Sequence, residues 1–126
     1  QILEDPKTAA EMVVQLSDLM RYIIYQGNSA KVRLEDDIEC LRNYIELEKI
    51  RHGDGLECTF QTNGILQHHQ IRPLLLIPFM ENAFKHGVAN SYDTASIDCK
   101  IDVVEGQLGF RLENSALEGN IIEEVE

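Results

Sequence analysis

The hydrophobic residues of this chain follow a helical period in some segments and a strand period in others. A wide apolar stripe over residues 8–26 predicts a helix with Thr8 as its N-cap, Glu11 completing a capping box, and Gly27 at its end. The width of that stripe predicts burial against more than one neighbour, as in a helical hairpin or a dimer bundle. A second helix is predicted over residues 34–52, where one apolar face contains Leu34, Ile38, Leu41 and Ile45.

Strand patterns dominate much of the remaining chain. Three segments alternate between apolar and polar residues: 56–61, 95–104 and 108–114. A turn at residues 105–107 joins the last two segments into a hairpin. Residues 116–126 are acidic and show no motif. The pattern as a whole predicts an α/β fold, with a lead helix and two further helices packed on one face of a mostly antiparallel sheet of three or more strands.

Residues 73–87 combine an apolar helical face with a polar end. Pro73 suits the first position of a helix, and Gly87 suits the residue after its last turn. The predicted buried face consists of Leu75, Leu76, Phe79, Met80, Ala83 and Phe84. Four polar residues fall on adjacent turns: Glu81, Asn82, Lys85 and His86. Oxygen ligands suit a hard cation and an ammonium group suits phosphate, so the set indicates a site for a metal-bridged phosphate. An ordinary amphipathic helix with a polar end is the alternative.

Three segments resemble sensor histidine kinases of the LytS-like class. The run Pro78–Gly87 resembles the N box of that class, P-x-[LVM]-E-N-A-[IF]-K-H-G. Residues 16–22 resemble the run L-S-x-L-[LM]-R-Y that follows the phosphoacceptor helix, and residues 44–54 resemble the segment Y-[IL]-x-[IL]-[EQ]-x-x-R-[FH]-G-[DE]. The resemblance runs from about residue 8 to residue 115 and implies a truncated two-layer sandwich of the GHKL (Bergerat) type that binds ATP and Mg²⁺.

The resemblance also implies a role for each polar residue of the site. Asn82 would bind Mg²⁺ through its amide oxygen, and Glu81 would orient a metal-bound water or polarise the incoming imidazole. Lys85 would neutralise phosphate charge, and His86 would hydrogen-bond a phosphate oxygen. Asn114 stands where the family has an Asp that recognises the adenine amino group. An amide has both a donor and an acceptor, so Asn114 could still hydrogen-bond adenine, but not with the preference of an Asp.

The same resemblance predicts how the chain is divided and what it binds. Residues 1–30 would be the second helix of a dimerisation and phosphotransfer hairpin, and residues 31–126 part of the catalytic domain. The implied partners are a second copy of the chain, through the N-terminal helix, and a response regulator of the LytTR type. The implied location is the cytoplasmic side of a bacterial protein anchored by upstream membrane helices. The phosphoacceptor segment is expected before Gln1 and the glycine-rich lid after Glu126, so we expect a fragment that binds ATP weakly and does not phosphorylate itself.

Composition changes this picture in a few respects. The net charge of -11 argues against a nucleic-acid partner bound through its phosphates, and the apolar fraction of 44% is that of an ordinary globular domain. The three cysteines are scattered without metal-ligand spacing and indicate free thiols in a reducing compartment. The pair His68–His69 suggests zinc, but adjacent residues point apart and no ligand set is completed nearby, so we expect a surface pair.

Two other functions stay open. The first is a degenerate nucleotide-binding or dimerisation module without kinase activity, which the acidic balance and Asn114 favour. The second is another ATPase of the GHKL superfamily, gyrase-like or chaperone-like. Residues 16–22 and 44–54 argue against the second, because both match the kinase class outside the site. Arg51 could position phosphates, but a surface cation on a helix is the favoured interpretation.

Overall fold

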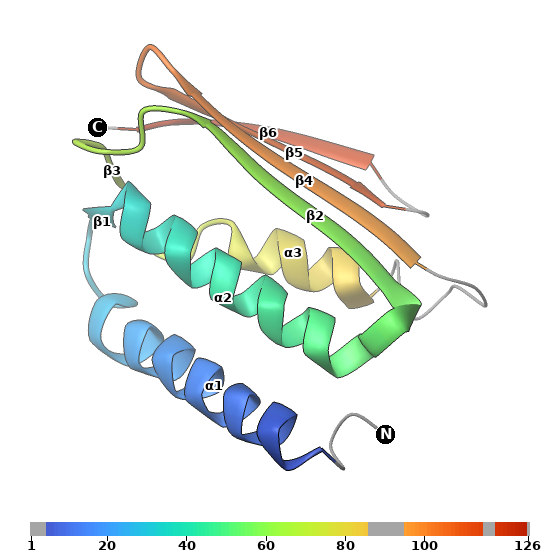
Figure 1. The fold of residues 1–126 in the computed structure, drawn as a ribbon. Helices are drawn as coiled ribbons and strands as arrows, with labels where there is room; N and C mark the ends of the chain where they lie inside the picture. The colour runs from blue at the N-terminus through green and yellow to red at the C-terminus, as the bar shows by residue number, and fades with distance from the viewer. Residues whose placement is uncertain (1–4, 86–94, 115–117, 126) are drawn as a thin grey trace.

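The computed structural model describes residues 5–85, 95–114 and 118–125, and arranges them in three layers (Figure 1). The first layer is the helix α1 (Pro6–Gln26). The second holds the helices α2 (Leu34–His52) and α3 (Ile77–Ala83), and the third is a four-stranded sheet. Because α2 packs against both α1 and the sheet, it is the central element of the fold.

The larger sheet has the strand order β2-β4-β5-β6. β2 (Leu56–Gly64) runs parallel to β4 (Ala95–Val104). β5 (Gln107–Asn114) is antiparallel to β4, and β6 (Glu118–Glu124) is antiparallel to β5. The predicted mixed α/β class, with two helices on one face of a mostly antiparallel sheet, is therefore confirmed.

Two short elements connect these layers. β1 (Val32–Arg33) pairs with β3 (Gln70–Ile71) in a separate two-stranded sheet next to the start of α2. The 3-10 turn η2 (Gly53–Gly55) leads from the end of α2 into β2. None of the helices that the structure describes combines the length and the apolar character needed to cross a membrane.

The hydrophobic core lies between the sheet and the two helices of the second layer. On β4 every second residue is buried: Ala95, Ile97, Cys99, Ile101 and Val103. The predicted apolar face of α2 is confirmed, since its four residues are each at most 2% exposed. Burying one aliphatic side chain of this size contributes about 1.5–3 kcal/mol, so this face is sufficient to hold α2 on the sheet.

Gly64→Ala should destabilise this sheet sharply. Gly64 ends β2 with φ +96°, and a Cβ atom there would stand 2.1 Å from the carbonyl oxygen of Val103 on β4. The left-handed backbone and the clash with main chain together should lower the free energy of unfolding by at least about 2 kcal/mol. Urea denaturation measures the loss. Gly55→Ala is the control, since a Cβ atom there would meet nothing within 4 Å, and equal losses in both variants would contradict the prediction.

The predicted start of the first helix was wrong by a few residues. The N-cap is Asp5, whose carboxylate accepts hydrogen bonds from the Lys7 amide at 3.1 Å and the Thr8 hydroxyl at 2.7 Å. Pro6 occupies the first turn, where the missing N–H costs nothing. An aspartate followed by a proline is thus the stronger start, and Thr8 lies inside the helix.

Most of the apolar stripe of α1 remains open in the single chain. Leu19 is the buried residue of α1, at 8% exposure. Six further apolar residues of the stripe are exposed: Val13, Val14, Leu16, Met20, Ile23 and Ile24. α2 therefore covers one side of the stripe, and the other side is left for a second neighbour.

The third helix starts later than predicted, and its predicted end at Gly87 lies outside the described residues. α3 begins at Ile77 with Pro78 in its first turn, so the expected start at Pro73 was wrong. Leu74 has φ 59°, a left-handed conformation through which an α-helix cannot continue. Its amide donates to the carboxylate of Asp37 at 2.9 Å. A hydrogen bond to a distant helix therefore holds the segment that leads into α3.

The acidic segment after Asn114 contains a strand that the sequence pattern did not predict. β6 pairs along its length with β5, with Ile121 opposite Phe110 and Gly119 opposite Leu112. Its two isoleucines are adjacent in sequence and do not alternate, so the local pattern carries no strand signal. Pairing with the open edge of β5 decides its conformation.

Candidate functional site

The last turn of α3 separates apolar from polar side chains. Met80 and Ala83 are buried at 0% and 2% exposure, and Phe84, directly after the helix, is buried at 4%. Three polar residues are exposed: Glu81, Asn82 and Lys85. Since the exposed side chains add nothing to the core, the carboxylate, the amide and the ammonium group are available to a ligand.

A cleft of about 400 Å³ lies between this turn and the last turns of α2. On one side it is lined by Glu81 of α3 and by the two residues after the helix, Phe84 and Lys85. Its residues from α2 are Tyr44, Glu48, Arg51 and His52. Two of the predicted site residues, Glu81 and Lys85, thus share one cavity with residues that lie roughly thirty to forty positions earlier in the chain. Asn82 is exposed on the same turn, next to Glu81.

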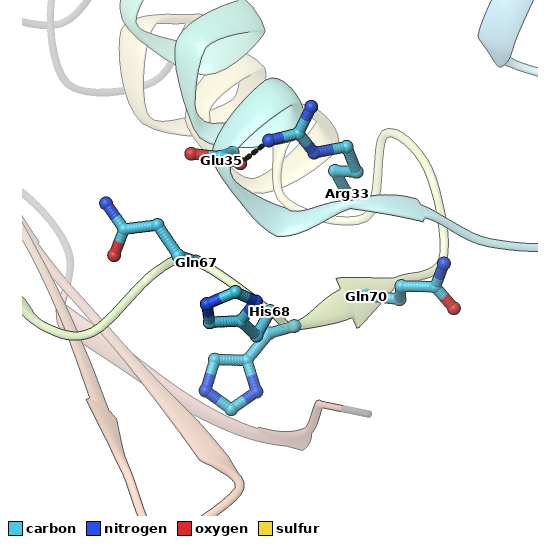
Figure 2. Close-up of a pocket in the computed structure, with 6 residues that line it drawn as sticks. Arg33, Glu35, Gln67, His68 and Gln70 are labelled. Atoms are coloured by element: carbon cyan, nitrogen blue, oxygen red, sulfur yellow. Dashed lines mark hydrogen bonds and ion pairs between the residues drawn. The ribbon is translucent and has the colours of Figure 1, made fainter.

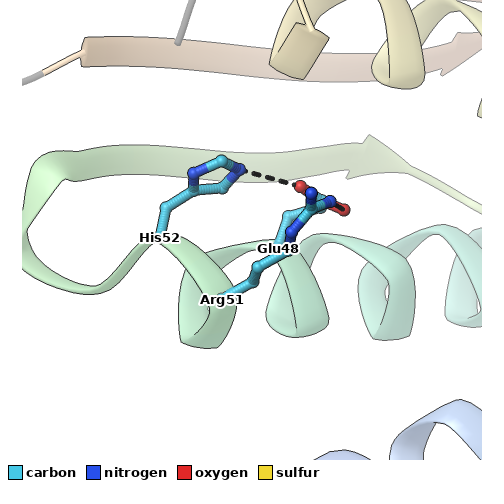
Figure 3. Close-up of polar contacts among 3 residues, drawn as sticks. All are labelled: Glu48, Arg51 and His52. Carbon is cyan, nitrogen blue, oxygen red and sulfur yellow. Dashed lines mark hydrogen bonds and ion pairs between the residues drawn. The ribbon is translucent and has the colours of Figure 1, made fainter. Parts of the chain in front are cut away.

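A polar cluster forms the α2 side of this cleft (Figure 3). Oε2 of Glu48 lies 3.1 Å from Nε2 of His52, and Oε1 of Glu48 lies 3.6 Å from a guanidinium nitrogen of Arg51. The Glu48 side chain is 12% exposed, whereas that of Arg51 is 69% exposed. This cluster was not predicted from the sequence, although its spacing of three and four residues on one helix is a signal that indicates it.

Aromatic contacts join the two sides of the cleft. The ring of Phe84 lies 5.8 Å from that of Tyr44 in an edge-on arrangement, and 6.4 Å from that of His52 in a stacked one. Burial raises the pKa of Tyr44, and the nearby charges of Glu48 and Glu81 raise it further. The phenol therefore stays neutral at physiological pH, and Glu81 supplies negative charge close to it.

Asn114 also lies at this end of α3. It ends β5, and its Nδ2 donates to the carbonyl oxygen of Ala83 at 3.4 Å. The structure therefore brings together four of the five predicted site residues: Glu81, Asn82, Lys85 and Asn114. The fifth, His86, lies outside the described residues.

A second cavity of about 500 Å³ adjoins the start of α2 (Figure 2). It is lined by Arg33, Glu35, Gln67, His68, His69 and Gln70. His68 is exposed and has φ 68°, and the Arg33 guanidinium pairs with the carboxylate of Glu35. In the parts of the chain that the structure describes, no three His, Cys, Asp or Glu side chains form a group that could hold a metal ion.

The cysteines are free thiols, as predicted. Burial raises the pKa of Cys40 and of Cys99 to about 12, and that of Cys58 to about 11. All three are therefore protonated at neutral pH and are poor nucleophiles.

Known proteins match this chain over part of its length. The family model described as Histidine kinase matches residues 1–56. The Sensor protein kinase HptS of Staphylococcus aureus strain USA300 is 33% identical over 96 residues, which are 76% of this chain and 18% of that protein. HptS of strain NCTC 8325 / PS 47 gives the same values. The chain thus spans less than a fifth of the length of the curated relatives it matches.

Proposed function

Because this chain belongs to the histidine kinase family, we propose that it is the part of a two-component sensor kinase that holds ATP with Mg²⁺ for phosphoryl transfer to a histidine. The observation that carries the proposal is the polar end of α3. A carboxylate, an amide and an ammonium group are exposed on one turn there, beside a cleft lined by a further cation. No packing role accounts for that combination.

The donor set of this turn fits a nucleotide with its metal. Asn82 would supply an amide oxygen to Mg²⁺, a ligand type suited to a hard cation, and the bound ion would neutralise charge on the phosphates. Lys85 and Arg51 add positive charge at the cleft, and we assign His86 to the phosphates by its motif. Glu81 would hold the incoming imidazole or a water through its carboxylate. These residues would act by positioning and by charge stabilisation, the main contributions in phosphoryl transfer.

We propose that the helical part and the catalytic part divide near residue 30, in a fold of the GHKL type. The exposed apolar residues of α1 support a homodimer through this helix, because a second helix would bury them. We also propose a response regulator as partner and a membrane-anchored parent protein, on the ground of the family alone.

One observation favours a second candidate, a degenerate module of the same family. Asn114, which replaces the adenine-binding Asp, donates its amide to the carbonyl oxygen of Ala83. A side chain used to hold the end of α3 is less suited to recognising adenine. Nucleotide affinity separates the two candidates.

Calorimetric titration of the chain with a non-hydrolysable ATP analogue tests the proposal. We expect weak binding in the presence of Mg²⁺. Chelation of the metal with EDTA should weaken it at least about tenfold, since one charge-assisted contact is worth about 1.5–3 kcal/mol. Absence of binding, or equal affinity with Mg²⁺ and with EDTA, would contradict the proposal and favour the degenerate module.

A further inference from the structure

Asp37 is the buried charged residue of the part of the chain that the structure describes. It lies on α2, is 5% exposed, and belongs to neither of the cavities described above. Burying a carboxylate is costly unless hydrogen bonds compensate, and an apolar side chain of similar size would hold two helices together as well. Packing alone therefore does not explain why a carboxylate occupies this buried position.

One oxygen of Asp37 connects three elements of the fold. Oδ1 accepts a hydrogen bond from the hydroxyl of Tyr22 on α1 at 2.9 Å. The same atom accepts a hydrogen bond from the amide of Leu74 at 2.9 Å, in the segment that leads into α3. Neither α1 nor this segment can shift against α2 without lengthening one of the two bonds.

Leu74 is held in an unusual conformation by these surroundings. Its φ of 59° is left-handed, a conformation that is unfavourable for a residue with a Cβ atom. Its side chain reaches the end of α1, since a Cβ atom placed on Gly27 would stand 3.4 Å from Leu74 Cδ1. α3 begins three residues later, at Ile77. The segment before α3 is thus linked to α1 through Asp37, and the Leu74 side chain lies close to the C-cap of α1.

The protonation states of Tyr22 and Asp37 favour the hydrogen bonds between these elements. Burial raises the pKa of Tyr22, and the charge of Asp37 raises it further, so the phenol remains a hydrogen-bond donor. Burial raises the pKa of Asp37, while the bonds from Leu74 and Tyr22 act in the opposite direction. The two donors are the groups that keep this carboxylate stable in the interior.

We infer that Asp37 is a positioning residue that couples α1 to the nucleotide site, by fixing the segment that sets where Glu81, Asn82 and Lys85 lie. A displacement of α1 against α2 would be passed through the shared oxygen to Leu74 and from there to α3. The expected change in nucleotide affinity rests on the proposed function, whereas the expected change in hydrogen exchange at the Leu74 amide does not.

Tyr22→Phe tests the coupling without touching α3. This variant keeps the ring and removes the hydroxyl, so Asp37 loses its bond to α1. We expect hydrogen exchange at the Leu74 amide to become about fivefold faster, and the affinity for a Mg²⁺–ATP analogue to fall about fivefold, the lower end of typical coupling between sites. Tyr25→Phe is the matched control, since Tyr25 lies on the same helix at 74% exposure, and it should change neither quantity.

A second pair of variants, both at Asp37, separates the effect of the hydrogen bonds from the effect of packing. Asp37→Asn keeps an oxygen acceptor and should preserve the slow exchange at Leu74, whereas Asp37→Ala should lose it. Leu74 exchange that is unchanged in Tyr22→Phe would overturn the inference, as would equal exchange rates in Asp37→Asn and Asp37→Ala. If the unsubstituted chain binds no nucleotide, the proposed function fails, and the exchange measurements still decide the coupling.

Discussion

Asn82→Ala is expected to abolish the Mg²⁺-dependent part of nucleotide binding while leaving the fold intact. Loss of groups that only support a metal ligand already weakens metal affinity about tenfold to a hundredfold, so loss of the ligand itself should cost at least as much. Asn82 is exposed, and a surface substitution of this kind changes the free energy of unfolding by within about 0.5 kcal/mol. Lost binding would therefore reflect the site and not unfolding.

Calorimetry with a Mg²⁺–ATP analogue measures this effect, and Asn63→Ala is the matched control. Asn63 is also exposed, but it lies on β2, where its amide donates to Asp102 at 3.0 Å. We expect the control to bind as the unsubstituted chain does. Unchanged affinity in Asn82→Ala, or the same loss in the control, would show that the polar end of α3 does not hold the metal.

Phe110→Ala should have the largest effect on stability. Phe110 is 2% exposed on β5, opposite Ile101 of β4, and its ring lies 6.2 Å from that of Phe79 on α3. Truncating a buried phenylalanine costs about 3–5 kcal/mol, a large share of the 5–15 kcal/mol that holds a small domain folded. We expect a much lower urea midpoint and, through the lost contact with Phe79, weaker nucleotide binding.

Phe110→Leu is the control for this prediction, because it keeps most of the apolar volume and leaves a smaller cavity. Its loss of stability should be less than half that of the alanine variant. Equal losses in the two variants would mean that the contact between the sheet and α3 does not depend on the volume at this position.

The dependence of the site on the core follows from the length of α3. A helix of seven residues is unstable by itself in water, because nucleating a helix is costly and few bonds repay it. Met80 and Ala83 hold it against the core, and Asp37 holds the segment before it. The exposed residues of the site are thus placed by buried contacts elsewhere in the molecule.

Local sequence determined the elements whose own residues contain the signal. The predicted bounds of α2 are those observed, because its core positions recur at the helical period and Gly53, with φ 62°, ends it. β4 and β5 were predicted from the alternation of apolar and polar residues. In the turn between them, both Glu105 and Gly106 have positive φ. The histidine kinase family was also predicted from short motifs, and the same motifs supply the residues of the proposed nucleotide site.

Tertiary structure alone decided three features. The segment before α3 is held because Leu74 bonds a carboxylate thirty-seven positions earlier, and β6 forms because β5 offers an open edge. The cleft beside Glu81 exists because the end of α2 packs next to α3. In each case the partner is distant in sequence, so no local period or propensity could reveal the contact that determines the conformation.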